Sequence, residues 1–312
     1  MAAVMAAELQ ALGPQGARLV AVGSRTQAAA DSFAKRFGIP RAHGSHEALA
    51  ADEAIDAVYI ASPPVAHAGN MLSCLRHRKA VLCEKPFTTN AAEAREAIDL
   101  ARTSGVFLME AMWTRFLPAV RALRELLASG AIGQIQLMIG GGAFVPDPEP
   151  GYYLFSPELG GGALLDAGVY LVSMSSMCLG APQRVLSSAE IGRHGVDDHD
   201  VLVLEHAGGA RSLLYVSLRA RRSPDLEILG DAGRIHVAAP IFKPPRLTLI
   251  RDGQEAQTLE YPVSGSGYGY QAVELMEAVR AGRTESAVMP LSETLSIMET
   301  LDEARRQWRS GL

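Results

Sequence analysis

The sequence has few cysteines and no long apolar stretch. Its three cysteines, Cys74, Cys83 and Cys178, are odd in number and far apart, which excludes a disulfide framework and favours a reducing compartment. Their spacing matches no metal site. No apolar stretch approaches the ~18 residues of a membrane span, and neither a basic segment nor a cleavage pattern follows Met1. We therefore expect a cytoplasmic protein without a membrane anchor or a metal.

The sequence also lacks a long basic run. Its formal net charge is -5, so the phosphate backbone of a nucleic acid or an anionic membrane surface is not an expected partner. Internal repeats and low-complexity linkers are absent as well. The expected ligands are small molecules.

What is present indicates two domains, because 312 residues with 48% apolar side chains can bury a core in each. In residues 1–107, β-like runs alternate with helical patterns, which predicts an α/β domain with a doubly wound, Rossmann-type parallel sheet. In residues 108–312, strand-like runs follow one another, which predicts an α+β domain with a mostly antiparallel open sheet. The expected strands of the first domain are 18–22, 55–61, 80–83 and 106–109, and its expected helices are 26–37, 67–76 and 90–102. In the second domain we expect strands at 135–139, 184–191, 201–206, 211–218, 226–229, 234–237 and 247–250, and helices at 117–128, 271–281 and 291–308.

Two segments carry groups suited to proton transfer. The apolar run 80–83 is followed by Glu84, Lys85 and Pro86, and the proline favours an extended lysine where the strand ends. Three glycines at 160–162 lead into a helical pattern on which Asp166 and Tyr170 lie four apart and share a face. Gly168, between these two residues, leaves room for another surface to approach.

Several further fragments occur with these motifs in one order along the chain: Leu19–Arg25, Ser62-Pro63-Pro64 with His67, Met109–Phe116, Gly230–Gly233 and Glu293–Asp302. With them, nearly the whole chain resembles the Gfo/Idh/MocA oxidoreductases. The likeness is greatest to the branch that contains dimeric dihydrodiol dehydrogenase and NADP-dependent D-xylose dehydrogenase. The resemblance implies hydride transfer between a nicotinamide cofactor and a hydroxyl-bearing carbon of a cyclic diol or sugar.

The residues agree with that chemistry. Oxidation of an alcohol requires a base at its hydroxyl. A phenol has an ordinary pKa of ~10, which a neighbouring ammonium lowers by favouring the phenolate. We therefore expect Lys85 and Tyr170 to be catalytic, with Asp166 binding a substrate hydroxyl or orienting the lysine. Asp166 could instead pair within its helix, and Tyr170 could serve packing.

Ser24 and Arg25 follow the first expected strand, where NAD enzymes usually carry an acid. An arginine suits a 2′-phosphate, so we expect NADP, with NAD possible. An alternative is that Arg25 is merely a solvated residue. The other residues expected at the cofactor are Ser62, Pro63, His67, Glu84, Lys85, Trp113 and Arg115. Glu84 could equally be an ion-pair partner, and Trp113 and Arg115 could be interface packing.

The glycine-rich turn of dinucleotide-binding domains is missing. The run 18–22 matches the family's second strand, and residues 2–11 match the helix that follows the glycine turn. The first strand is central in the doubly wound order 3-2-1-4-5-6, so its absence would leave two interior strand edges unpaired. The hypothesis is that the sequence begins about one strand late and that the native product is longer.

Two other functions remain open. One is a regulator that senses a dinucleotide without chemistry, and the other is a sugar hydrolase that retains NAD. The resemblance also suggests a homodimer formed through the antiparallel sheet. All four residues of the run Val201–Leu204 are apolar. A strand formed by this run would therefore carry apolar side chains on both of its faces, as if both faces of the sheet were covered. A monomer whose sheet is covered by helices on both faces would have the same sequence pattern.

Overall fold

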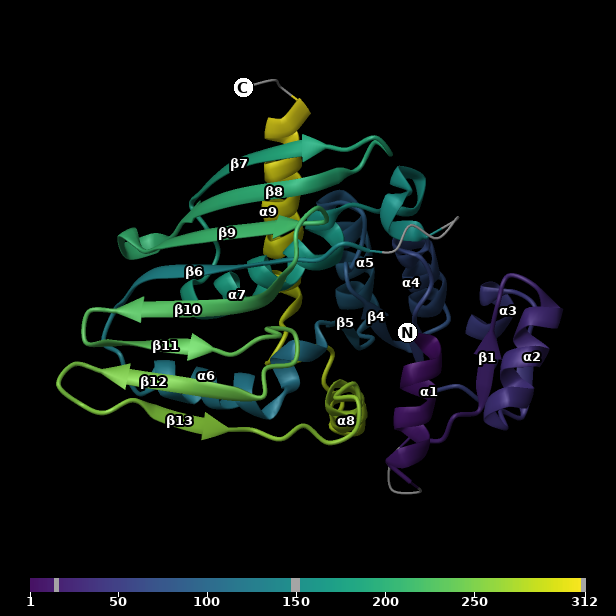
Figure 1. The fold of residues 1–312 in the computed structure, drawn as a ribbon. Coiled ribbons are helices and arrows are strands. Elements are labelled where there is room, and N and C mark those ends of the chain that lie inside the picture. Colours follow the sequence, from purple (N-terminus) through teal and green to yellow (C-terminus); the bar gives the residue numbers. More distant parts are fainter. Residues whose placement is uncertain (14–16, 147–151, 310–312) are drawn as a thin grey trace. The chain divides into compact units, whose positions relative to one another are not determined.

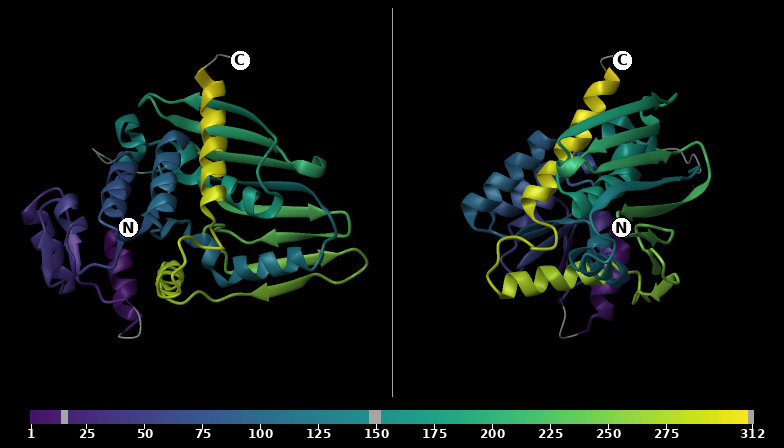
Figure 2. Two further views of the ribbon diagram at one scale, coloured as in Figure 1. Left: turned by 180° about the vertical axis from the view of Figure 1, so that it is seen from behind. Right: turned by 90° about the vertical axis from the view of Figure 1, so that its left-hand side faces the viewer.

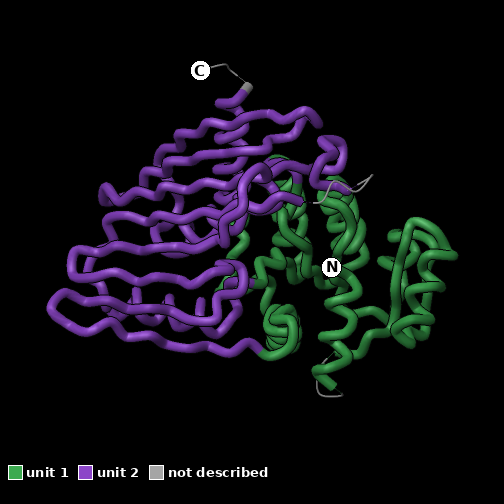
Figure 3. The backbone as a smooth tube through the Cα atoms, viewed as in Figure 1, with its two compact units in different colours: residues 1–88, 92–113, 264–294 green, residues 89–91, 114–263, 295–312 purple. Residues whose placement is uncertain are grey.

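The computed structural model describes residues 1–13, 17–146 and 152–309. The chain forms two compact units, shown in separate colours in Figure 3. The first unit comprises residues 1–88, 92–113 and 264–294, and the second comprises 89–91, 114–263 and 295–312. From the sequence, the loop 146–157 is expected to contribute to the shape of the substrate pocket, and its residues 147–151 lie outside the described residues.

The first unit consists of short parallel strands and the helices that connect them (Figure 1). Its helices are α1 (Ala2–Ala11), α2 (Gln27–Phe37), α3 (His46–Ala50), α4 (His67–Arg76), α5 (Ala91–Ser104) and α8 (Gly269–Arg280). Its strands are β1 (Ala21–Gly23), β2 (Arg41–His43), β3 (Ala57–Ile60), β4 (Ala80–Glu84) and β5 (Leu108–Ala111). The sequence predicts most of these elements, but β2 and α3 were not expected because each is only three to five residues long.

The parallel strands of this unit form two separate sheets, β1-β2 and β3-β4-β5. Among the described residues, β1 pairs only with β2, and β3 pairs only with β4. Within the described residues, each of these two sheets is therefore open at both of its edges. β4 lies between two partners and is buried along its whole length, so the position at which it ends is well defined.

Local chemistry explains where α2 begins and ends. The Thr26 side chain accepts a hydrogen bond from the Ala29 amide at 3.3 Å, which satisfies a free N–H group in the first turn. Gly38 stops the helix in the left-handed conformation, with φ of 63°. The helix therefore ends as the sequence predicts.

Helix α8 belongs to the first unit although residues 114–263, which precede its segment, belong to the second. The Glu8 carboxylate of α1 accepts hydrogen bonds from the backbone amides of Ser266 at 2.5 Å and Gly269 at 3.2 Å. The Leu108 amide donates to the Thr284 carbonyl at 3.1 Å. The sequence predicts a single domain boundary after residue 107. That boundary does not account for the segment 264–294, which packs with the first unit through contacts between residues far apart in the sequence.

The second unit is built on an eight-stranded sheet in the order β13-β12-β11-β10-β6-β9-β8-β7. Its strands are β6 (Ile135–Ala143), β7 (Arg184–Ile191), β8 (Asp197–Glu205), β9 (Arg211–Ser217), β10 (Arg222–Gly230), β11 (Gly233–Val237), β12 (Arg246–Arg251) and β13 (Gln257–Glu260). Its helices are α6 (Pro118–Ala128), α7 (Val169–Leu179) and α9 (Leu291–Arg309), whose first four residues fall in the first unit. Among the described residues of this sheet, only the β6–β9 pair is parallel, so the expectation of a mostly antiparallel sheet is confirmed.

Helices α6, α7 and α9 lie against one face of this sheet (Figure 2). Alternate residues of β8 and β9, such as Leu202, Leu204 and Leu214, are buried at 1% exposure, as a strand with one covered face requires. Strand β13 was not expected, because its residues Gln257–Glu260 are mostly polar.

One helical segment, Pro157–Leu179, is long and apolar enough to cross a membrane by length and composition, which the sequence analysis did not anticipate. It is interrupted by glycines, and 72% of its most apolar window is buried inside the structure. That burial is typical of a core helix.

Candidate functional site

The sequence-predicted site residues fall in both units, and each group is described within its own unit. In the first unit they lie where parallel strands end. Lys85 follows β4, is half-buried, and its amide donates to Glu84 Oε2 at 3.2 Å. The Lys85–Pro86 peptide bond is cis. The lysine is therefore placed by a buried strand on one side and by a proline on the other.

Glu84 has a buried partner that the sequence analysis missed. The Tyr59 hydroxyl, on β3, donates a hydrogen bond to Glu84 Oε1. Glu84 is 4% exposed, and burial raises the pKa of its carboxyl, while Tyr59 and Lys85 act in the opposite direction. Burial also raises the pKa of Tyr59, so its hydroxyl stays protonated and remains a donor. Strand pairing between β3 and β4, which brings Tyr59 beside Glu84, is not readable from local sequence.

His67 connects the segments that follow β3 and β4. Its Nδ1 lies 2.9 Å from the Pro86 carbonyl oxygen, and its Nε2 lies 2.8 Å from the Ser62 carbonyl oxygen. The side chain is 1% exposed, and burial lowers its pKa despite these acceptors. The described residues contain no group of three or more metal-ligating side chains. His67 is the first residue of α4, as predicted, and its ring lies between the Ser62 and Pro86 carbonyl oxygens, to one of which the neutral imidazole donates.

Ser24 and Arg25 follow β1. The Ser24 amide donates to the His43 carbonyl at 3.0 Å, which continues the β1–β2 pairing for one residue. Arg25 is exposed and has no hydrogen-bond or ion-pair partner among the residues that the structure describes. Its guanidinium group is therefore available to an anion.

Trp113 and Arg115, which the sequence analysis grouped together, lie on one 3-10 turn, Trp113–Phe116, but contact different partners. Trp113, in the first unit, stacks on Tyr268 with ring centroids 4.3 Å apart and an interplanar angle of 17°. Arg115, in the second unit, is 1% exposed and donates to Ser173 Oγ at 3.0 Å and to the Ser173 carbonyl at 2.6 Å. These contacts stabilise α7. A role at the cofactor stays a prediction for both.

In the second unit, Asp166 lies on a single π-helical turn, Leu164–Gly168, that continues into α7 with Tyr170 in its first turn. The sequence predicts an ordinary helix here. Both side chains are half-buried. A Cβ at Gly168 would lie 2.9 Å from Leu164 of the same turn and 3.5 Å from Val216 of β9, an ordinary van der Waals distance, so the tightest contact at this glycine is made by its own turn and not by another surface.

Aromatic residues surround this pair. The Tyr153 hydroxyl donates a hydrogen bond to Asp166 Oδ1, and the Tyr170 and Phe242 rings are 6.0 Å apart at their centroids. Tyr153 and Phe242 were not expected from the sequence, because both lie in irregular segments with no periodic pattern. The second unit thus presents a carboxylate and a phenol in a partly apolar setting.

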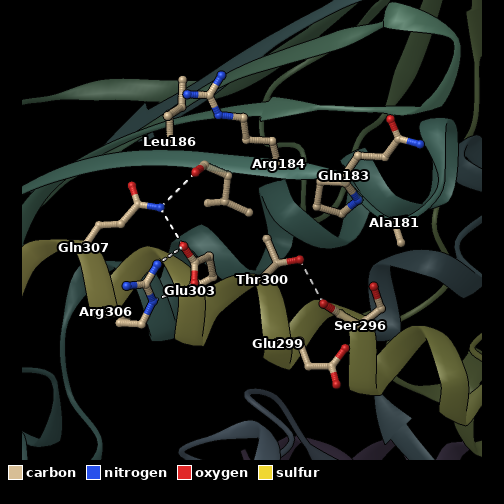
Figure 4. A pocket seen from close by; sticks show the side chains of 12 residues that line it. Ala181, Gln183, Arg184, Leu186, Ser296, Glu299, Thr300, Glu303, Arg306 and Gln307 are labelled. Carbon is tan, nitrogen blue, oxygen red and sulfur yellow. Dashed lines mark hydrogen bonds and ion pairs between the residues drawn. The ribbon is translucent and has the colours of Figure 1, made fainter.

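A separate pocket of about 600 Å³ lies in the second unit between β7 and α9 (Figure 4). Charged side chains line it, including Arg184, Glu299, Glu303 and Arg306. None of the predicted site residues borders it. Arg306 forms an ion pair with Glu303 at 2.7 Å, so these two opposite charges of the pocket lining neutralise each other.

Comparisons with known proteins agree with this arrangement of motifs. The family model described as an oxidoreductase family with an NAD-binding Rossmann fold matches residues 2–112, and the GFO/IDH/MocA C-terminal domain matches residues 120–236. The trans-1,2-dihydrobenzene-1,2-diol dehydrogenase of Mus musculus is 36% identical over 299 residues, which cover 93% of this chain and 88% of that protein. The human enzyme is 35% identical over 309 residues, covering 96% and 91%.

A solved structure supports the same grouping. The 3-ketoreductase KijD10 from Actinomadura kijaniata, in complex with NADP, matches with a TM-score of 0.85 and 27% identity, covering 96% of this chain and 92% of that one. A levoglucosan dehydrogenase has the same fold, with a TM-score of 0.87 at 20% identity. With both halves matched by family models and relatives above 30% identity along most of its length, the chain belongs to the Gfo/Idh/MocA family of oxidoreductases.

Proposed function

We propose that this protein is an NADP-dependent dehydrogenase that oxidises a hydroxyl-bearing carbon of a cyclic vicinal diol or a cyclic sugar. The observation that carries the proposal is Lys85 at the end of buried β4, in a chain 36% identical to a dihydrodiol dehydrogenase. When bound, the nicotinamide supplies the hydride acceptor. The protein has to bind the substrate and accept the hydroxyl proton.

The chain offers three groups for that task. The Tyr170 hydroxyl accepts the substrate proton as phenolate, and the Lys85 ammonium favours that phenolate electrostatically. Asp166, oriented by the Tyr153 hydroxyl, accepts a hydrogen bond from a substrate hydroxyl. A vicinal diol offers two neighbouring hydroxyls, one for Tyr170 and one for Asp166.

The described residues fit the dinucleotide in part. Arg25 is an exposed, unpaired cation at the end of β1, where a 2′-phosphate is recognised in this class of fold. Ser62 and Pro63 follow β3, fixed by the buried His67. The glycine turn that would hold the pyrophosphate has no counterpart in the sequence. We propose that residues 1–107 bind the dinucleotide and residues 108–312 bind the substrate, except that the segment 264–294 completes the first unit.

The proposal is tested by following NADPH formation with trans-dihydrodiols and D-xylose, with an acyclic diol as control. Turnover of a cyclic substrate is the expected result. Dinucleotide binding without turnover of any substrate would instead identify a regulator. Cleavage of a glycoside without net NADPH formation would identify an NAD-retaining hydrolase. The curated relatives named above are dehydrogenases, which supports the first outcome.

Replacing Arg25 with serine is expected to weaken NADPH binding about tenfold to a hundredfold and to change NADH binding less than twofold. A hydrogen bond between charged groups contributes roughly 1.5–3 kcal/mol, and of the two nucleotides only NADPH carries a 2′-phosphate. Fluorescence titration with both nucleotides measures this. Arg76→Ser, at an exposed side chain in the last turn of α4, is the matched control. Equal losses for the two nucleotides would refute the role of Arg25.

We also propose that the protein is a homodimer formed through the uncovered face of the second-unit sheet. On this face, Ile139 of β6 pairs in register with Leu213 of β9, which pairs with Val203 of β8. Ile139 and Leu213 are each 39% exposed, Val201 is 44% exposed and Leu186 is 39% exposed. A contiguous apolar patch on several neighbouring strands favours association.

Val201→Glu is expected to convert the dimer to a monomer in sedimentation velocity, because a charge placed on the patch would be buried unpaired in the dimer. Val65→Glu places the same charge at a side chain of equal exposure, 44%, in the first unit. A wild-type protein that sediments as a monomer would end this proposal. The three cysteines are free in the structure, in keeping with the cytoplasmic location that we propose.

A further inference from the structure

A buried acidic pair lies at the start of β8, beside the π-helical turn. Asp197 is 7% exposed and Asp200 is 0% exposed. Asp197 Oδ2 accepts a hydrogen bond from the Leu164 amide at 2.6 Å. The Asp200 carboxyl interacts with the Asp197 side chain by a hydrogen bond, and its oxygens have no other hydrogen-bond partner among the described residues. The sequence analysis gave neither residue a role, and the proposed chemistry does not use them.

A glycine makes the contact with Asp197 possible. Gly162 has φ of 114°, a conformation that favours glycine, and a Cβ at this position would lie 2.1 Å from Asp197 Oδ1. The carboxylate therefore rests against the Gly162 backbone while it accepts the Leu164 amide. The Gly162 carbonyl in turn accepts the Asp166 amide at 3.2 Å. Asp197 thus contacts the backbone at the point where the turn that carries Asp166 begins.

The first amides of a helix have no acceptor within the helix, so an acidic side chain there stabilises a particular helix start. The segment 164–170 has no other side-chain cap: neither the π-helical turn nor α7 shows a side-chain capping bond at its N-cap residue. We propose that Asp197, supported by Asp200, is a positioning residue that fixes the start of this helix and so the placement of Asp166 and Tyr170. This inference rests on the proposed function for its kinetic consequence only.

The charge of the pair is shared unequally. Burial raises the pKa of both carboxyls. Together with the nearby Asp197 charge, it raises the pKa of Asp200 to about 10. The Leu164 amide acts to lower the pKa of Asp197. Asp200 is therefore neutral near pH 7, and Asp197 is the member better suited to carry the negative charge.

Few other charged groups face the pair. Asp198 lies on the same strand and pairs with Arg219, Arg305 lies on α9, and Asp166 lies on the π-helical turn. The residues paired with Asp200 on the neighbouring strands, Ala189 and Val216, are uncharged.

The test compares Asp197→Ala, which removes the acceptor, with Asp197→Asn, which keeps an oxygen for the Leu164 amide. Asp198→Ala, at the adjacent position, is the control. We expect Asp197→Ala to lower kcat at least tenfold and to leave NADPH affinity within twofold. Asp197→Asn is expected to restore kcat to within about threefold of wild type. Equal losses in the alanine and asparagine variants would overturn the role as acceptor.

A second readout does not depend on activity. Hydrogen exchange of the peptide segment 162–170 is expected to become at least tenfold faster in Asp197→Ala and to stay unchanged in Asp198→Ala. Unchanged exchange in Asp197→Ala would overturn the inference even if the dehydrogenase activity is confirmed. Faster exchange in a protein that oxidises no substrate would support it while the proposed function fails. If Asp197→Ala does not fold, Asp197→Glu takes its place in the test, because the longer glutamate side chain moves the carboxylate away from the Leu164 amide. Hydrogen exchange at the wild-type rate in Asp197→Glu would then refute the proposal.

Discussion

A Lys85→Met variant is expected to lose about a thousandfold in kcat for NADP-dependent oxidation, equivalent to about 4 kcal/mol of barrier. Methionine keeps the length and apolar stem of lysine but removes the ammonium, so the phenolate form of Tyr170 loses its electrostatic support. Because Lys85 is half-buried at the end of a buried strand, the change should alter the fold little. Steady-state kinetics with a cyclic diol, alongside thermal unfolding, measures both effects.

The pH dependence of this variant gives an independent check. Without the ammonium, the base should titrate closer to the ordinary phenol value of ~10, so kcat/KM should keep rising at pH values where the wild type has levelled off. Lys35→Met, on the exposed face of α2, is the control and should keep the wild-type profile. A Lys85→Met enzyme with kcat within tenfold of wild type would rule out the proposed role of the lysine.

Tyr170→Phe is expected to lower kcat by a factor of roughly 10²–10⁴, since general base catalysis contributes about that much. The substitution removes only the hydroxyl, so the ring can still pack against Phe242. NADPH affinity and thermal stability should therefore stay close to wild type, which separates a catalytic loss from a structural one. Pre-steady-state measurement of NADPH formation isolates the chemical step.

Two further tyrosines serve as comparisons. Tyr261→Phe, beyond β13, should be neutral. Tyr153→Phe should have an intermediate effect, because it removes only the hydrogen bond that orients Asp166. If Tyr170→Phe retains full activity while Tyr153→Phe does not, Tyr170 is a packing residue and the base must be sought near Asp166.

The sequence predicts best those parts that depend on local chemistry. Thr26 and Gly38 bracket α2 because capping and the left-handed conformation are properties of single residues. Lys85 could be placed near a strand end because the short apolar run 80–83 precedes it, and the structure shows that this strand is buried. The family resemblance further singled out Asp166 and Tyr170, and the structure places both at the start of one helical segment.

The features that were missed depend on contacts between distant residues. Tyr59 meets Glu84 only through the pairing of β3 with β4, and Asp197 meets Leu164 only when β8 lies beside the start of α7. The π-helical turn differs from an α-helix by a change in hydrogen bonding that leaves no periodic signal in five residues. Cofactor contacts of Trp113 and Arg115 could not be separated from packing, since buried aromatic and guanidinium groups serve both purposes.

The interleaving of the two units has a consequence for any attempt to divide the protein. The chain passes between them at five places, 88/89, 91/92, 113/114, 263/264 and 294/295. A recombinant fragment that stops at Trp113 would lack Tyr268, on which that indole stacks, and the Ser266 and Gly269 amides that contact Glu8. A single proteolytic cut therefore cannot release either half intact, and the dinucleotide half has to be completed by a segment synthesised more than 150 residues later.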